Sequence, residues 1–430
     1  MDTQAQPVVV VLACAAAFAA YLSMYAFRKP ISATGYTGVN GLTLLGTVFD
    51  YKAIALVSQL LGYMCSKFLG VKFASEAPLM RRAPNVLGLI AFAWLMLVLF
   101  AVTPAPYNLI WLFFNGLPLG MVWSMLFGIL EGRRITDFLG LAMSVSVVFA
   151  SGWVKAVGLW SIDSWGVSPF WMPAVTGALF FPLLLIALLV LASLPPPRDE
   201  DVSDRSARLP MDAEARSHFV RVFFPGVAAL MSAYVVLISY RALRDDFMDL
   251  ILSDLGYEIQ AADFASIESL VGTVVVATLA GLWFVKSNQS AVWVCAGLVA
   301  SGSVLAGLST LLLQNGVLGP REFFIVNGVG LYIAYVPLQT IMIDRLLATL
   351  GPVATGAFLI AAADAFGYVS IVGLYLSKNI VSELVGQAFN WTQLLMSASV
   401  VVALFVPATI LYAVFYFRSK STLSAQVPRP

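Results

Sequence analysis

The first long apolar segment of this 430-residue sequence carries a basic side chain and two tyrosines at helical spacing. Tyr21, Tyr25 and Arg28 are spaced i, i+4 and i+7, so they share one face of a helix. An arginine presents a planar fork of donors that matches a phosphate or a carboxylate, and tyrosine hydroxyls can add donors beside it. This face predicts a site that binds a small anion.

The second apolar segment carries a similar face, because Gln59, Tyr63 and Lys67 are spaced i, i+4 and i+8. The fifth apolar segment adds a positive charge at Lys155. A charge inside a membrane span is costly, and by default it marks a site, a pathway or an ion pair. We therefore include Tyr63, Lys67 and Lys155 among the predicted substrate-binding residues.

The seventh apolar segment supplies Arg241 and Arg244. The run SYRALR that ends at Arg244 matches the run SMYAFR that ends at Arg28, 216 residues earlier. Two arginines related by an internal repeat could hold one anion from opposite sides. Arg244 is therefore predicted as the partner of Arg28, and Arg241 as a further binding residue.

Each of these basic residues also has a simpler interpretation. Arg28 and Lys29 precede Pro30, so they could end a helix and extend to the outer headgroups, as long basic side chains do. Lys29 lies about 100° further round the helix than Arg28, and we predict it as a gating residue. Lys67 could instead begin a loop on the inner side.

Three acidic residues are predicted to act in coupling or gating. Asp364 lies deep in the eleventh segment, where it could pair with a buried basic group or carry a proton. Glu268, about one turn into the eighth segment, could hold Arg241 or Arg244 when no substrate is bound. Asp249 follows Arg244 in the seventh segment. Five aromatic or amide residues could line a cavity, although packing is the commoner role: Trp123, Tyr234, Tyr332, Tyr335 and Gln339.

Composition places these residues in a membrane protein. The chain is 60% hydrophobic and 11% charged, whereas a soluble domain carries about 25% charged residues. The net charge of +1 gives no reason to expect nucleic acid binding, and the single histidine, His218, excludes a histidine cluster for metal. Three separated cysteines read as small apolar residues, with no disulfide or metal site. We predict no metal, no cofactor and no enzymatic activity.

Twelve apolar runs are long enough to cross the hydrocarbon, which takes about 20 residues. The excess of Lys and Arg in alternate loops predicts that both termini lie in the cytoplasm. We expect the membrane to be a bacterial inner membrane. The runs fall near 7–29, 50–70, 84–103, 107–130, 138–160, 170–194, 222–246, 263–285, 290–313, 322–344, 352–375 and 391–417.

An internal duplication divides the twelve runs into two sets of six. Besides the arginine segment, Asn115-Gly116 recurs as Asn327-Gly328, and GWVKAVGLW from Gly152 recurs as GYVSIVGLY from Gly367. The polar stretch 195–218 separates a six-helix bundle at 1–194 from a second at 219–430. An even number of spans gives the halves the same orientation, as in parallel-repeat transporters with a central substrate site. The predicted fold is an all-α membrane protein with two pseudo-symmetric bundles, and we expect a monomer.

The motifs resemble those of the organophosphate:phosphate antiporters, a major-facilitator family. Tyr25-Ala26-Phe27-Arg28-Lys29 is similar to that family's Tyr-x-x-Arg-Lys, and Tyr63-Met64-Cys65-Ser66-Lys67-Phe68 to its Tyr-x-x-Ser-Lys-Phe. Arg244 with Asp249, and Glu268, match its seventh and eighth helices. The family's Asp-Arg after the second helix is absent, as is its fifth-helix histidine, near which Lys155 lies.

The resemblance implies that Arg28 and Arg244 bind a phosphoryl group, which Tyr21, Tyr25, Tyr63 and Lys67 support. It implies that Glu268 pairs with basic groups. The function expected from residues and resemblance together is transport of a small organic anion, a phosphate ester or a carboxylate, with phosphate or a proton as counter-substrate. The alternatives are a membrane sensor that binds an anion without transport and a proton-coupled carrier of another solute.

Overall fold

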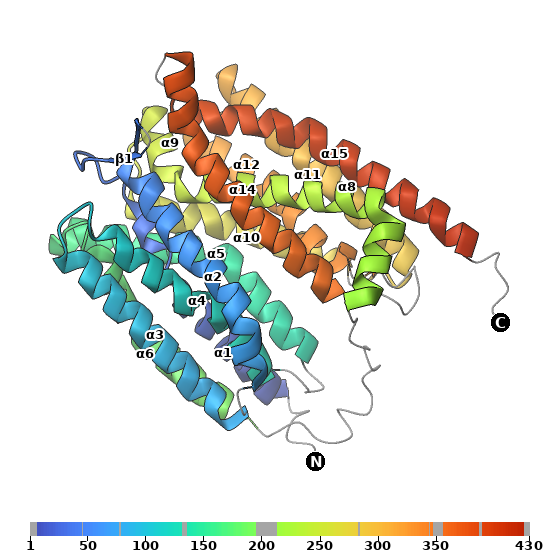
Figure 1. Cartoon of the computed structure of the whole chain (residues 1–430), viewed down its shortest axis with the longest axis horizontal. Coiled ribbons are helices and arrows are strands. Elements are labelled where there is room, and N and C mark those ends of the chain that lie inside the picture. The colour runs from blue at the N-terminus through green and yellow to red at the C-terminus, as the bar shows by residue number, and fades with distance from the viewer. Residues whose placement is uncertain are drawn as a thin grey trace. The chain divides into compact units, whose positions relative to one another are not determined.

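The computed structural model describes residues 7–194 and 213–424, apart from 45, 77–78, 131–135, 283, 344, 347–355 and 387–388. In this part of the chain nearly all regular structure is helical, with one two-stranded hairpin (Figure 1). The helices are α1 (Pro7–Tyr25), η2 (Pro30–Ala33), α2 (Tyr51–Glu76), α3 (Leu79–Val102), α4 (Leu109–Leu130), α5 (Thr136–Trp165), α6 (Met172–Ala192), α8 (Ala213–Asp246), α9 (Met248–Asp254), α10 (Ala261–Leu282), α11 (Asn288–Gln314), α12 (Pro320–Pro337), η3 (Leu338–Met342), α14 (Gly356–Val385) and α15 (Trp391–Ser424). The antiparallel strands are β1 (Leu42–Leu44) and β2 (Thr47–Phe49), with Thr43 opposite Val48.

The helices match the predicted spans. Ten described helices are long and apolar enough to cross a membrane. Helices α2 and α14 are not among these ten, but at 26 and 30 residues they also exceed the roughly 20 needed to cross. Each of the twelve predicted spans overlaps one of these helices. Large apolar side chains such as Ile186 (60% exposed) and Leu404 (71%) point outward, as a lipid-facing surface requires.

Local sequence signals set several helix ends. A proline occupies the first turn of α6 and α12, where its missing N–H is not needed. The Ser287 side chain caps α11 by accepting a hydrogen bond from the Ser290 N–H. Helix α5 ends at Gly166, whose φ of +65° suits glycine, and the next N–H, of Val167, bonds back to the Ser161 carbonyl.

The first predicted span is wrong at its end. The prediction runs to residue 29, but α1 ends at Tyr25. Arg28 and Lys29 lie in the turns that follow, with both N–H groups bonded to the Tyr25 carbonyl. Pro30 explains the early end, because a proline disfavours helical geometry in the residue before it.

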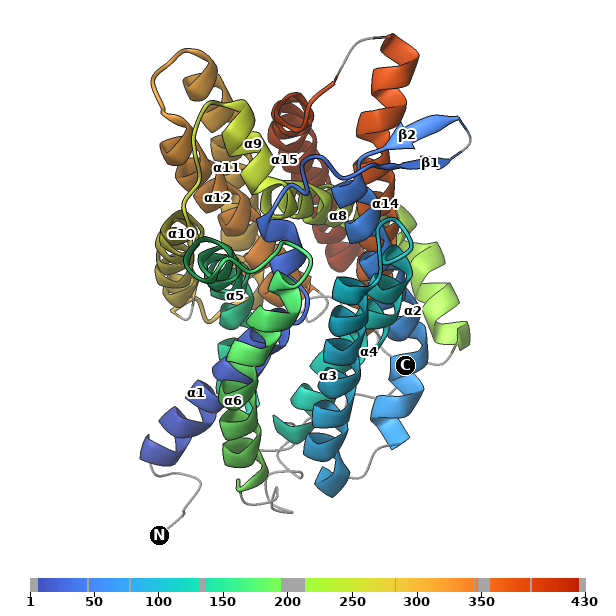
Figure 2. The same ribbon diagram turned by 90° about the vertical axis from the view of Figure 1, so that its left-hand side faces the viewer.

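The chain forms two compact units. Unit 1 contains Met1–Ser206, Glu258–Ser269 and Tyr375–Ala388, and unit 2 contains Ala207–Tyr257, Leu270–Leu374 and Phe389–Pro430. Unit 1 therefore includes the beginning of α10 and the end of α14. In unit 1, α3 and α6 lie side by side, as both views show (Figure 1, Figure 2). The predicted boundaries of the two bundles stay a prediction.

Helix packing repeats between the units. Helices α3 and α4 pack together in unit 1, as α11 and α12 do in unit 2. Helices α1 and α6 correspond in the same way to α8 and α15, and α3 and α6 to α11 and α15. These pairs are the ones that the duplication places in equivalent positions.

The repeated Asn-Gly pair supplies buried hydrogen bonds at equivalent places. The Asn115 amide donates to the carbonyls of Phe27 (3.2 Å) and Ala93 (2.9 Å). The Asn327 amide donates to the carbonyl of Ala306, at 3.1 Å. Ala93 and Ala306 occupy corresponding helices, so each asparagine ties the fourth helix of its repeat to the third. Both asparagines are fully buried.

Close helix packing explains three of the four glycines in the other repeated motif. A Cβ at Gly152, Gly158 or Gly367 would lie within 3 Å of a neighbouring helix. A Cβ at Gly373 would meet no heavy atom within 4 Å. Close packing therefore does not account for Gly373.

Candidate functional site

Unit 1 gathers an arginine and four aromatic side chains. The Arg28 guanidinium lies over the Tyr63 ring, 4.2 Å from its centroid. Tyr21 contacts Tyr25 and Trp123 edge-on, with ring centroids 5.4 and 4.7 Å apart. The three tyrosines are at most 5% exposed, whereas Arg28 is half-buried. The contacts thus form two groups, one joining Arg28 to Tyr63 on α2 and one joining Tyr21 and Tyr25 on α1 to Trp123 on α4.

Lys155 and Glu268 lie where α5 and α10 approach each other within unit 1. Both are completely buried. The Lys155 ammonium lies 5.1 Å from the centroid of the Phe264 ring, on α10. A Cβ at Gly152, one turn before Lys155 on α5, would lie 2.6 Å from the Glu268 Cβ. The small residue at 152 therefore lets the buried glutamate approach α5.

The remaining basic candidates of unit 1 have different positions. Lys29 is 7% exposed, so it does not extend into solvent, and its carbonyl accepts a hydrogen bond from the Ser32 hydroxyl. Lys67 lies in α2, but its side chain is outside the described residues. No group of three His, Cys, Asp or Glu within the described residues could hold a metal ion.

Unit 2 joins Asp364 to two tyrosines and an arginine. The Tyr234 hydroxyl donates to Asp364 Oδ1 at 2.5 Å and lies 3.4 Å from the Tyr335 hydroxyl. The Arg241 guanidinium lies over the Tyr335 ring, 5.1 Å from its centroid. Arg241 and Asp364 are half-buried, and the tyrosines are at most 4% exposed. We call these four residues the α8–α12–α14 cluster.

Arg244 lies in the interior of unit 2. It is completely buried, and its Nη2 donates to the Phe324 carbonyl on α12 at 2.7 Å. Its guanidinium also lies 5.4 Å from the Phe324 ring centroid and occupies the space that a side chain at Gly328 would need. The two arginines of the repeat therefore have different surroundings, because Arg28 is half-buried over a tyrosine ring.

The sequence alone gives little reason to assign the two tyrosines of the α8–α12–α14 cluster to a site. Tyr234 and Tyr335 are more than 100 residues apart, and membrane tyrosines are more often packing residues. The sequence does show that Tyr234 precedes Arg241 by seven residues, a spacing that places both on one face of a helix. Asp249, in the first turn of α9, is 7% exposed. Tyr332 is buried and Gln339 half-buried.

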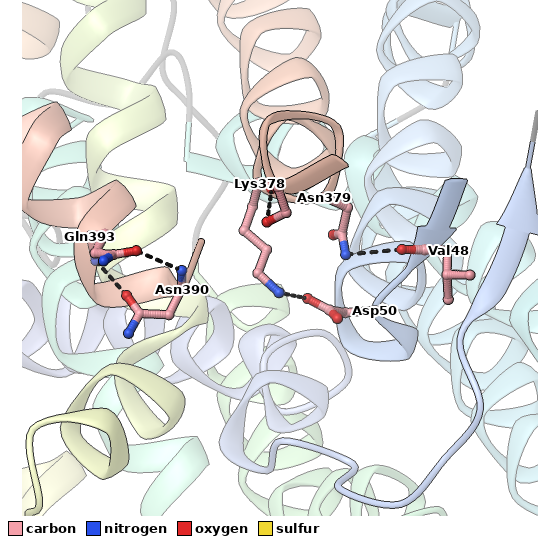
Figure 3. Close-up of polar contacts among 7 residues, drawn as sticks. Val48, Asp50, Lys378, Asn379, Asn390 and Gln393 are labelled. Carbon is pink, nitrogen blue, oxygen red and sulfur yellow. Dashed lines mark hydrogen bonds and ion pairs between the residues drawn. The ribbon is translucent and has the colours of Figure 1, made fainter. Parts of the chain in front are cut away.

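A polar contact that the sequence did not indicate holds the end of α14 within unit 1. The Lys378 ammonium pairs with the Asp50 carboxylate at 2.8 Å, and Asn379 donates to the Val48 carbonyl at 3.1 Å (Figure 3). The Thr47 hydroxyl also donates to Glu383. The hairpin β1–β2 and Asp50, which follows it, thus contact successive turns of α14.

We predict that the Lys378–Asp50 pair contributes only about 0.2–1 kcal/mol, because the two side chains are 17% and 38% exposed. Thermal unfolding of Lys378→Met, Asp50→Asn and the double variant in detergent would measure the coupling energy. The exchanged pair Lys378→Asp with Asp50→Lys is expected to recover part of the loss. Additive single losses would show that the two charges do not interact.

Solved structures with the same fold are transporters. The chain matches a D-xylose–proton symporter with a TM-score of 0.60 at 13% identity, over 93% of this chain and 98% of that one. It matches a bacterial homologue of the human lysosomal transporter Spinster with a TM-score of 0.61 at 11% identity, over 99% and 100%. The xylose transporter XylE from E. coli matches with a TM-score of 0.57 at 14% identity, over 93% and 97%. The fold is that of the major-facilitator transporters, in a multi-pass membrane protein.

The chain belongs to the family described as a family of unknown function, DUF5690, which it matches over residues 30–420. No curated protein matches the sequence. The three solved structures named above are not organophosphate carriers by their descriptions, so the resemblance to that family stays a prediction.

Proposed function

We propose that this protein is a secondary active transporter that moves a small organic anion by alternating access. The observation that carries the proposal is a half-buried arginine over a tyrosine ring inside each unit. Arg28 lies over Tyr63 in unit 1, and Arg241 lies over Tyr335 in unit 2. The fold makes transport the expected activity, and these arginines make the expected substrate an anion.

An arginine whose guanidinium lies over a tyrosine ring is suited to bind an anion. A tyrosine face attracts a guanidinium through its quadrupole, by about 0.5–2 kcal/mol depending on desolvation. A guanidinium has five N–H donors, so it can donate to an anion while its charge lies over a ring. In unit 1, Tyr21 and Tyr25 lie on α1, which ends three residues before Arg28, and their hydroxyls can add donors. A phosphate or carboxylate accepts this kind of donor set bidentately.

The proposal assigns the arginines of the repeat unequal roles. Arg28 and Arg241 are half-buried and bind the anion, whereas Arg244 is completely buried and bonds a backbone carbonyl. Binding of an anion offsets the charge of the arginine beside it. A carrier whose empty site keeps that charge resists the passage between its outward- and inward-facing states, which favours exchange of anions.

A thermal-shift screen of the purified protein in detergent identifies the substrate class. The panel contains inorganic phosphate, phosphate esters, mono- and dicarboxylates, and uncharged sugars as the contrasting class. A ligand that binds only the folded state raises the melting temperature. At a concentration 100 times its Kd, it stabilises the folded state by about 2.7 kcal/mol. Hits are then tested for uptake into lipid vesicles. Binding without uptake would favour the anion sensor, and hits confined to sugars would contradict the anion proposal.

We predict that Arg28→Ala and Arg241→Ala each weaken anion binding by about 10- to 150-fold. The estimate corresponds to the loss of a charged hydrogen bond, about 1.5–3 kcal/mol. The matched control is Arg418→Ala, which removes an exposed arginine near the end of α15. The measurement is the ligand concentration that gives the half-maximal thermal shift. Equal affinities in all three variants would show that neither Arg28 nor Arg241 binds the anion.

A further inference from the structure

We propose that Asp364, Tyr234 and Tyr335 form a proton-binding site in unit 2, whose occupancy sets the charge presented beside Arg241. The proposal rests on the proposed function and adds the ion that regulates the same site. It concerns only the α8–α12–α14 cluster.

Hydrogen bonding gives the Asp364 carboxyl two defined states. Tyr234 donates to Asp364 Oδ1 at 2.5 Å, a length typical of an O–H bond to a charged oxygen. The ionised carboxylate can therefore be held by the tyrosine hydroxyl. A carboxyl that has taken up a proton becomes a donor itself, so the hydroxyl can turn toward Tyr335, whose hydroxyl is 3.4 Å away. The pair of tyrosines thus accommodates both forms of the acid.

The surroundings of the carboxyl connect its charge to the arginine. Around it, α8 supplies Tyr234 and Arg241, and α12 supplies Tyr335. The guanidinium lies 5.1 Å from the Tyr335 ring centroid, and the Tyr335 hydroxyl lies beside that of Tyr234. When Asp364 is ionised, its negative charge offsets part of the positive charge of Arg241. Proton uptake removes that offset and makes the surroundings of Arg241 more positive, which favours an anion.

Exposure distinguishes Asp364 from Glu268, another carboxyl within a span. Glu268 is completely buried against α5, whereas Asp364 is half-buried. A proton has to reach the group from water, so the half-buried carboxyl is the better placed one. Ionisable groups within spans commonly serve as proton relays in pumps and transporters.

The test is substrate-independent, which separates it from the test of the proposed function. Acid-minus-alkaline infrared difference spectra are recorded on the purified protein in lipid. The wild type is expected to show a reversible carbonyl band of a protonated carboxyl, which Asp364→Asn removes and Asp364→Glu displaces in frequency. Tyr234→Phe is expected to keep the band and to displace the pH at which it is half-formed. Ser370→Ala is the matched control, because Ser370 bonds Ser239 between the same two helices, α14 and α8.

Two results would overturn the proposal. One is a carbonyl band in folded Asp364→Asn that equals the wild-type band. The other is a wild-type spectrum with no carboxyl band that titrates. Circular dichroism and thermal melting establish that each variant is folded, and Asp364→Glu supplies a folded acidic variant if Asp364→Asn fails to fold. Neither result depends on whether the protein transports an anion.

Discussion

Arg244→Ala is expected to destabilise the protein by roughly 3 kcal/mol or more. The substitution removes a charged hydrogen bond to the Phe324 carbonyl, worth about 1.5–3 kcal/mol, and leaves that buried oxygen without the guanidinium. It also leaves a cavity where the side chain lay against Gly328, and cavities in a packed core add to the loss. Thermal unfolding in detergent, followed by tryptophan fluorescence, measures the change.

Two companion variants make this prediction specific. Arg244→Lys keeps the charge but loses the planar fork, so an intermediate melting temperature is expected. Arg241→Ala removes a half-buried arginine three residues earlier in the same helix and is expected to melt close to the wild type while it loses anion binding. If instead Arg244→Ala melts like the wild type and loses binding, the symmetric pair of binding arginines predicted from the repeat is correct.

Gly116→Ala is expected to prevent α2 and α4 from packing. A Cβ at this position would collide with the Gln59 carbonyl and lie 2.9 Å from the Tyr63 backbone nitrogen. Both obstacles are backbone, so the two helices would have to separate, and overpacking of this kind typically costs about 1–3 kcal/mol. Separation would also disturb the bond from the Gln59 amide to Asn115, now 2.7 Å long. Folded yield and thermal unfolding report the effect.

The matched control is Gly373→Ala in α14. No heavy atom lies within 4 Å of a Cβ at this position, so the methyl group meets open space. Alanine is favoured over glycine in a helix by about 1 kcal/mol, and the variant should be as stable as the wild type or slightly more so. A loss of stability in Gly373→Ala as large as that in Gly116→Ala would show that helix approach is not the cause.

The helices could be predicted because hydrophobic length and helix-breaking residues are local properties of the chain. Each predicted span overlaps a helix, including α2 and α14. The clearest departure at the site is the end of α1 at Tyr25, which Pro30 accounts for. The hairpin β1–β2 escaped prediction because its strands have only three residues each, too few to show alternation.

The contact of Tyr21 with Tyr25 was predictable, because the two residues are one turn apart on α1. The position of Arg28 over Tyr63 was not, because Arg28 lies in the turns after α1 and Tyr63 lies on another helix. The α8–α12–α14 cluster was not, because Tyr335 and Asp364 contribute from helices far along the chain. Spacing within one helix identifies a shared face but does not say which residues of other helices lie opposite it.

The sequence by itself determined a membrane protein with a duplicated helical pattern and arginines in its spans. It also identified the repeated Asn-Gly pairs, whose asparagines make equivalent hydrogen bonds in both units. Only the tertiary structure decided that Arg28 and Arg244 differ. Pro30 ends the helix before Arg28, which then lies over Tyr63, whereas Gly328 leaves room for Arg244 beside α12. A repeat preserves where a residue lies along its helix, but the neighbouring helices decide whether its charge is available to a ligand or bonded in the interior.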